Sequence, residues 1–168
     1  MSPVDRGRGS LDRAAASIRE IGDVAAKHGV QVALEFNSQA EQLNALDRVR
    51  EALALAGHPH CGLLLDTYHL QRSGGDARAL EDIAPEEIIY FQYSDVPRSG
   101  LQPGMALDRL PPGQGSVPFR EIFRVLGSKG YRGYLSYEAP NSSAWSRNPE
   151  DVAREALQAT RALLSETR

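Results

Sequence analysis

The amino-acid sequence predicts an α/β domain built around a parallel β-sheet. Segments with apolar residues at helical spacing alternate with short apolar segments along the chain, which is typical of a parallel sheet covered by helices. The central segment, residues 62–66, holds three consecutive leucines, the pattern of a strand buried on both faces. No linker breaks the alternation, so we expect one domain at residues 10–168 after a disordered segment at residues 1–9.

The alternation gives each element an expected range. The first helix is predicted from Ser10, its expected N-cap, to about residue 28, and a strand follows at residues 30–36. A second amphipathic helix is expected at residues 40–56, ending at Gly57. The later expected elements are a strand that ends at Asp66, a short helix at 77–83, a strand at 88–93, a helix at 117–126, a strand at 134–138, and a helix at 150–164 opened by Pro149.

Composition excludes several classes of protein. Apolar residues make up 41% and charged residues 24% of the 168 residues, which are ordinary globular values. The net charge is −3 with no basic block, so nucleic acid is not an expected partner. Cys61 is the only cysteine, which excludes an internal disulfide or a thiolate zinc site. No long apolar run or signal-peptide pattern is present, so we expect a cytoplasmic protein that binds no membrane.

A residue that can coordinate a cation stands at the end of each predicted strand. These residues are Glu35, Asp66, Gln92 and Glu138. Since the carboxyl ends of parallel strands share one rim of the sheet, we expect the four to lie together. Three crowded carboxylates repel one another unless a cation compensates, and oxygen donors favour Mg²⁺ or Mn²⁺ over Zn²⁺. For Asp66, a second interpretation is that it caps a helix and that His69, three residues later, is incidental.

Several stretches carry a family resemblance. They are Ala33-Leu34-Glu35-Phe36, Leu65-Asp66-Thr67-Tyr68-His69, Phe91-Gln92-Tyr93-Ser94-Asp95, Arg109 with Pro112-Gly113-Gln114-Gly115, and Gly133 to Glu138. From about residue 10 the chain resembles the C-terminal half of the xylose-isomerase-like TIM barrels, the sugar phosphate isomerase/epimerase superfamily. The resemblance implies four parallel βα units that form half of a (β/α)8 barrel.

The resemblance also implies residue roles. Glu35, Asp66, Gln92 and Glu138 would bind a divalent metal, Mn²⁺ or Mg²⁺, with Co²⁺ and Zn²⁺ as alternatives. Glu35 and Glu138 would also be catalytic, while His69 and Arg109 would bind substrate oxygens. Epimerase-like members usually have His where this chain has Gln92, and Gln at this position is similar to the pattern in some 3-dehydroshikimate-dehydratase-like members.

The implied activity is metal-dependent isomerisation or epimerisation of a small sugar, sugar phosphate or polyol-derived carbonyl compound through an enediolate. A first alternative is a metal-dependent dehydratase, because the same groups can eliminate water β to a carbonyl. A second alternative is an inactive half-barrel that acts as a partner subunit or a metal-binding module. A related endonuclease branch that binds DNA is disfavoured by Gln92 and by the net charge.

Four strands leave two edges of the sheet to be paired. The expected alternatives are a fragment of a longer protein, a half-barrel that dimerises, and one part of a split enzyme. In the last two, a homodimer or a separate partner chain would complete the barrel and cover inward residues such as Leu64, Phe91 and Leu135 or their neighbours. The loop at residues 96–115 is expected to be a lid that brings Arg109 to the site only with substrate. Asp95, at the start of this loop, either supports Gln92 or caps the loop.

Overall fold

The structure is a computed structural model that describes residues 11–101, 104 and 106–167. The disordered segment expected at residues 1–9 and the N-cap expected at Ser10 lie outside the described residues. Within the described residues, no helix is both long enough and apolar enough to cross a membrane.

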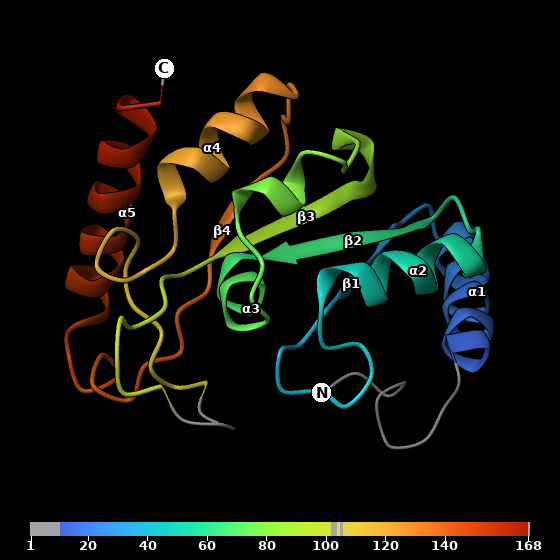
Figure 1. Cartoon of the computed structure of the whole chain (residues 1–168), viewed down its shortest axis with the longest axis horizontal. Coiled ribbons are helices and arrows are strands. Elements are labelled where there is room, and N and C mark those ends of the chain that lie inside the picture. The colour runs from blue at the N-terminus through green and yellow to red at the C-terminus, as the bar shows by residue number, and fades with distance from the viewer. Residues whose placement is uncertain (1–10, 102–103, 105, 168) are drawn as a thin grey trace.

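Four parallel strands form one sheet, in the order β1-β2-β3-β4 (Figure 1). The strands are β1 (Val32–Glu35), β2 (Cys61–Asp66), β3 (Ile88–Tyr93) and β4 (Leu135–Tyr137). Consecutive strands are neighbours and every pair is parallel, so each connection must cross from one end of the sheet to the other. The predicted α/β fold of four parallel βα units is confirmed.

Among the described residues, five α-helices and two short 3₁₀ helices precede, connect and follow the strands (Figure 1). They are α1 (Leu11–Lys27), α2 (Leu46–Ala56), α3 (Thr67–Arg72), η2 (Ala77–Leu80), η3 (Pro85–Glu87), α4 (Phe119–Ser128) and α5 (Pro149–Ser165). The helix expected at residues 77–83 is therefore a single 3₁₀ turn. The separate helix α3 was foreseen only in the interpretation that Asp66 caps a helix.

The helix expected from residue 40 begins only at Leu46, because the preceding segment forms a turn. The side chain of Asn37 accepts a hydrogen bond from the backbone N–H of Gln39, and the backbone of Asn37 pairs with Leu43 and Ala40. Short polar side chains compete with helical hydrogen bonds in this way. Leu43 is nevertheless buried in the core. An apolar residue at this position therefore fits the helical spacing of the apolar residues that follow, although the segment is not helical.

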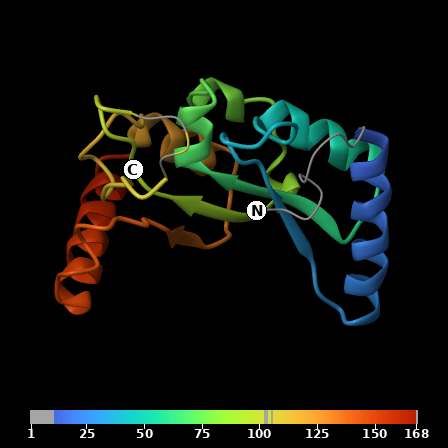
Figure 2. The same ribbon diagram turned by 90° about the horizontal axis from the view of Figure 1, so that it is seen from below.

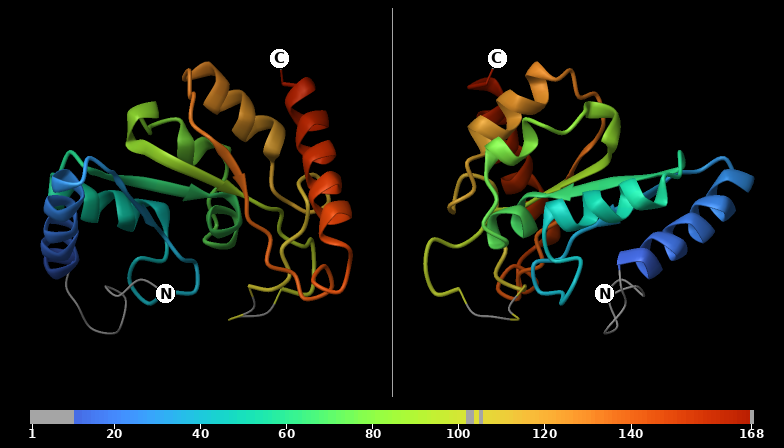
Figure 3. Two further views of the ribbon diagram at one scale, coloured as in Figure 1. Left: turned by 180° about the vertical axis from the view of Figure 1, so that it is seen from behind. Right: turned by 45° about the vertical axis from the view of Figure 1, so that its right-hand side comes forward.

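The helices lie on one side of the sheet. In Figure 2, α2, α3 and α4 cover the upper face of the sheet, and α1 and α5 lie at its two ends. Both views in Figure 3 show α1 and α5 at opposite ends of the molecule. Leu63, Leu65 and Phe91 point into this layer and are completely buried. Of the residues named for the inward face, Leu64 lies on the other face as expected, but Phe91 does not, and Leu135, which pairs in register with Phe91, also packs against the core. Side chains alternate between the two faces of a strand, and a run of apolar residues does not show which of them face the helices.

The other face of the sheet has no helix among the described residues (Figure 2). Leu64 pairs in register with Tyr90, and both are only half-buried. Tyr134, just before β4, is 81% exposed. We call this surface, with Leu64, Tyr90, Gln92 and Tyr134, the open face. Its outer strands, β1 and β4, are the edges of the sheet.

The strand register brings the polar strand ends to one rim. Asp66 pairs with Gln92, and Gln92 pairs with Ser136. Glu35 pairs with Leu64, two residues before Asp66, whereas Glu138 comes two residues after Ser136. The four predicted residues therefore follow the rim in steps, as the stagger of strands in a barrel requires.

Asp95 holds the loop that follows β3. Its completely buried carboxylate accepts hydrogen bonds from the backbone N–H groups of Val96, Gly113, Gly115 and Val117 at 2.7–2.9 Å. A Cβ at Gly115 would lie 2.1 Å from the carbonyl oxygen of Val96, so only glycine fits there. Of the two roles considered for Asp95, the structure supports that of a loop anchor.

Replacing Asp95 with alanine should destabilise the protein by at least about 2 kcal/mol, because three buried N–H groups and the partly buried one of Gly113 lose their acceptor. Urea unfolding monitored by circular dichroism measures the change. The control is Asp76→Ala, which removes a carboxylate that accepts from one exposed N–H, that of Arg78; its cost should stay near 1 kcal/mol. Equal effects of the two substitutions would contradict the anchoring role.

Candidate active site

Asp66 is the most buried charged group on the rim. Its side chain is completely buried, and its Oδ1 accepts hydrogen bonds from the backbone N–H groups of Tyr68 (2.6 Å) and His69 (3.2 Å) in the first turn of α3. Its Oδ2 accepts a hydrogen bond of 2.8 Å from Arg109. Asp66 therefore caps a helix, as the second interpretation expects, and it also belongs to a polar cluster that includes His69.

Arg109 lies at the centre of the cluster and is 4% exposed. Its Nη1 donates to Asp66 Oδ2 and to Glu138 Oε2, each at 2.8 Å, and its Nη2 lies 3.1 Å from His69 Nε2. The guanidinium also stacks on the ring of Tyr68, with Cζ 4.4 Å from the ring centroid. A single cationic group thus contacts three of the residues that the sequence placed in the site.

The backbone of Arg109 is fixed on both sides. Its N–H donates to the carbonyl of Pro140, and its carbonyl accepts from the side chain of Asn141. The next residue, Leu110, pairs with the anchored Asp95 in a β-bridge. The expectation that Arg109 reaches the site only with substrate is wrong, because contacts within the protein already hold it there.

Glu35 carries a carboxyl oxygen without a hydrogen-bond partner. Its Oε1 is buried and unpaired among the described residues. Burial first, and then the nearby charges of Asp66 and Glu138, raise the pKa of Glu35 to about 7, although Arg109 acts in the opposite direction. Burying an acceptor without a partner costs free energy. A proton or a cation bound to this oxygen would therefore be stabilising.

His69 is buried and neutral. Burial lowers its pKa to about 4, with Asp66 opposing the shift and Arg109 adding to it. Its Nε2 lies 3.9 Å from Glu35 Oε1, and a neutral ring makes this a polar contact and not an ion pair. Its Nδ1 lies 3.0 Å from the hydroxyl of Ser38, which orients the ring. The backbone N–H of Ser38 also donates to Nδ1 at 3.2 Å, so Ser38 holds this side of the ring and leaves Nε2 facing Glu35 and Arg109.

The rim residues fit a divalent cation. Glu35, Asp66 and His69 each offer a donor atom, and these atoms all lie within 4.8 Å of one another. Gln92 stands beside Asp66 on the open face, because its neighbours Phe91 and Tyr93 face the core. The sequence placed His69 against substrate and not among the ligands. The signal that could have placed it there is the Asp66-x-x-His69 spacing, which brings both side chains to the start of one helix.

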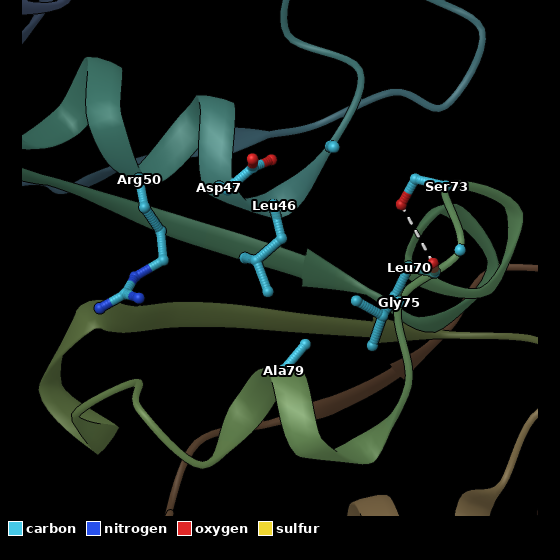
Figure 4. Close-up of a pocket in the computed structure, with 9 residues that line it drawn as sticks. Leu46, Asp47, Arg50, Leu70, Ser73, Gly75 and Ala79 are labelled. Atoms are coloured by element: carbon cyan, nitrogen blue, oxygen red, sulfur yellow. Dashed lines mark hydrogen bonds between the residues drawn. The ribbon is translucent and has the colours of Figure 1, made fainter.

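A cavity lies outside this cluster. It has a volume of about 360 Å³ and lies between the start of α2, the end of α3 and η2 (Figure 4). Leu46, Leu70 and Ala79 supply apolar lining, and the guanidinium of Arg50 in its wall is paired with Glu87. No residue of the rim cluster lines it, so the site is assigned from the cluster and not from the cavity.

Comparison with known proteins identifies sequence relatives. The chain is 28% identical over 159 residues to a 3-dehydroshikimate dehydratase of Pseudomonas putida, covering 90% of this chain and 24% of the relative. It is 26% identical to an inosose isomerase of Halalkalibacterium halodurans, covering 85% and 51%. It is 30% identical to a ketose 3-epimerase of Arthrobacter globiformis, covering 79% and 43%. The chain thus spans about a quarter to a half of the length of these relatives.

Solved structures share the fold. A crystal structure of IOLI protein with a binding zinc atom superposes with a TM-score of 0.87 at 21% identity, covering 98% of this chain and 61% of that one. A structure of L-ribulose 3-epimerase gives a TM-score of 0.77 at 22% identity, covering 98% and 58%. Residues 2–163 match the family described as xylose isomerase-like TIM barrel. The chain therefore belongs to the xylose isomerase-like TIM barrel family.

Proposed function

We propose that this chain carries the active site of a divalent-metal-dependent isomerase or epimerase that acts on a small polyhydroxylated carbonyl compound. The observation that carries the proposal is the rim cluster, where Glu35, Asp66 and His69 can share one cation and Glu138 stands beside them. The relatives named isomerase and epimerase support it. The chain covers only about half of the length of these relatives. That the whole protein has this activity is therefore also a proposal.

Glu35, Asp66 and His69 would hold the metal, with Gln92 and Glu138 as the further ligands that the family resemblance implies. When bound, a divalent cation polarises a carbonyl and an adjacent hydroxyl and stabilises the negative charge that develops on their oxygens. Two carboxylates and an imidazole suit Mn²⁺, Co²⁺ or Zn²⁺ as well as Mg²⁺.

Glu35 and Glu138 would move the proton. Glu35 ends β1 and Glu138 follows β4, so they approach the site from the two outer strands. One carboxylate would remove a proton from the carbon beside the carbonyl, and the other would return one to the opposite face or to the neighbouring carbon. Arg109 would hold substrate oxygens.

A dehydratase is the second candidate. Gln92 favours it, since the family resemblance links Gln at this position to dehydratase-like members, and the relative from Pseudomonas putida is named 3-dehydroshikimate dehydratase. Here one carboxylate would remove the proton and the other would protonate the departing hydroxyl as water. The product would be lighter than the substrate by one water, whereas an isomerase leaves the mass unchanged. An inactive half-barrel would bind metal without turnover.

We also propose that a second copy of this chain closes the barrel. All strands are parallel and the two edges are β1 and β4, so a two-fold axis along the barrel would place β4 of each copy parallel to β1 of the other. This would pair both edges at once and cover the open face. A separate chain with four βα units is the other way to reach the same closure.

Glu138→Gln should lower the activity of the Mn²⁺-loaded protein by at least about 100-fold, because the variant loses a proton carrier. The assay uses a panel of ketoses, inosose and 3-dehydroshikimate, with product masses measured by mass spectrometry. The control is Glu155→Gln, whose carboxylate pairs with Arg147 at the surface. Full activity of the Glu138 variant would refute the assigned role.

Glu35→Gln should change how stability depends on pH. In the wild type the folded pKa of Glu35 is about 7 against an ordinary 4.5. The folded state therefore keeps a proton that the unfolded state loses, and Glu35 lowers the free energy of unfolding as pH rises from about 4.5 to 7. His69 acts in the opposite direction between about 4 and 6.5, but it does so in both proteins.

The variant should therefore gain stability relative to the wild type across this pH range. Urea unfolding at pH 5, 6, 7 and 8 measures the difference. The exposed Glu20→Gln serves as the matched control on α1. A difference between Glu35→Gln and wild type that stays constant with pH would show that burial does not raise this pKa.

Light scattering at micromolar concentration should give twice the 18.3 kDa mass of one chain. Tyr134→Arg places a charge on the open face and should yield monomers, since desolvating an unpaired charge at an interface is costly. The control is Trp145→Arg, at a residue that is 66% exposed outside the sheet. A wild-type monomer that melts sharply and binds no hydrophobic dye would refute closure by a second copy.

A further inference from the structure

We propose that Arg109 is a built-in competitor of the divalent cation, so that the cation binds only when the guanidinium leaves its place on Asp66 and His69. The inference rests on the proposed function in one respect, since it takes the rim cluster as the metal site. It goes further in making Arg109 set the affinity for the metal. It also couples metal binding to the availability of Arg109 for substrate.

The guanidinium occupies the donor atoms that a cation needs. Asp66 Oδ1 is used by the start of α3, which leaves Oδ2 to face the site, and Arg109 Nη1 lies 2.8 Å from this Oδ2. On His69, Nδ1 faces Ser38, which leaves Nε2, and Arg109 Nη2 lies 3.1 Å from it. A cation bound at about 2.0–2.6 Å from the same two atoms has no room beside these nitrogens.

Charge makes the two occupants exclusive. The carboxyl groups of Glu35, Asp66 and Glu138 meet one guanidinium, which contacts Asp66 and Glu138 but leaves Glu35 Oε1 unpaired. A divalent cation would serve Glu35 and Asp66 together with His69. Since the cation and the guanidinium repel each other at short range in a buried site, the site favours one or the other.

Release requires only a side-chain movement. The backbone of Arg109 stays fixed by Pro140, Asn141 and the bridge at Leu110. The ion pair between Arg109 and Glu138 is accessible to solvent, because the side chain of Glu138 is 42% exposed. Its Nε has no hydrogen-bond partner among the described residues, so all hydrogen bonds of the guanidinium come from Nη1 and Nη2, and its remaining contact is the stacking on Tyr68. A rotation about the side-chain bonds towards Glu138 would vacate Asp66 and His69.

The coupling has a consequence for function. A displaced guanidinium faces the open side of the rim with free donors, where it can bind substrate oxygens. Metal binding would therefore prepare the substrate site. Each ligand must favour the state in which Arg109 is released, and their affinities then rise together.

The first test is calorimetric titration of the metal-free chain with Mn²⁺. Arg109→Met removes the competing charge and keeps an unbranched apolar side chain against Tyr68. It should bind Mn²⁺ roughly tenfold or more tightly than wild type, within the ~5–150-fold range usual for coupled sites. Arg147→Met is the matched control, since Arg147 is an exposed arginine paired with Glu155, and it should bind as wild type does. Equal or weaker binding by the Arg109 variant, or no binding by either protein, overturns the proposal.

The second test uses the wild-type chain and so does not depend on a variant that folds. A dicarbonyl reagent that modifies accessible guanidinium groups should label Arg109 slowly without Mn²⁺ and faster with it, as read by peptide mass spectrometry. Arg147 and Arg154, both half-exposed or more, should label at unchanged rates. Labelling of Arg109 that Mn²⁺ slows or leaves unchanged overturns the proposal. If Mn²⁺ binds and speeds the labelling of Arg109 but no substrate is converted, the proposed function is refuted, whereas the competition between Arg109 and the metal is supported.

Discussion

The site depends on the buried ion pair between Asp66 and Arg109. Both side chains are nearly or completely removed from water, and a buried charge is tolerated only when it is paired and hydrogen-bonded. Asp66 meets this condition with two backbone N–H groups of α3 and one guanidinium nitrogen. The short helix α3 and the loop that carries Arg109 each supply part of what the carboxylate requires.

The hydrogen bonds of Asp95 fix the position from which Arg109 reaches Asp66. By accepting four backbone N–H groups, Asp95 fixes the loop after β3, and the adjacent bridge to Leu110 sets the backbone of Arg109. A long side chain on a fixed backbone has few ways to reach Asp66 and Glu138 together. The structure thus fixes the backbone of Arg109, and the proposed release from Asp66 and His69 would need a movement of its side chain only.

The same four strands explain why the chain resembles proteins with several different activities. The rim supplies acids, an imidazole and a guanidinium, and these groups can serve proton transfer or elimination. The relatives include isomerases, an epimerase and dehydratases. Substrate choice within a barrel is set by the loops and the wall opposite the ligands, and the open face in this chain lacks that wall among the described residues.

The sequence by itself determined the alternation of helices and strands, the parallel sheet and the arrival of Glu35, Asp66, Gln92 and Glu138 at one rim. These features follow from local spacing and from the common direction of parallel strands. Only the tertiary structure decided that Phe91 faces the helices, that Asp95 anchors the loop and that Arg109 lies on Asp66 and His69. Each of these depends on contacts between residues far apart in the chain, as between Asp66 and Arg109, and local periodicity carries no record of such contacts.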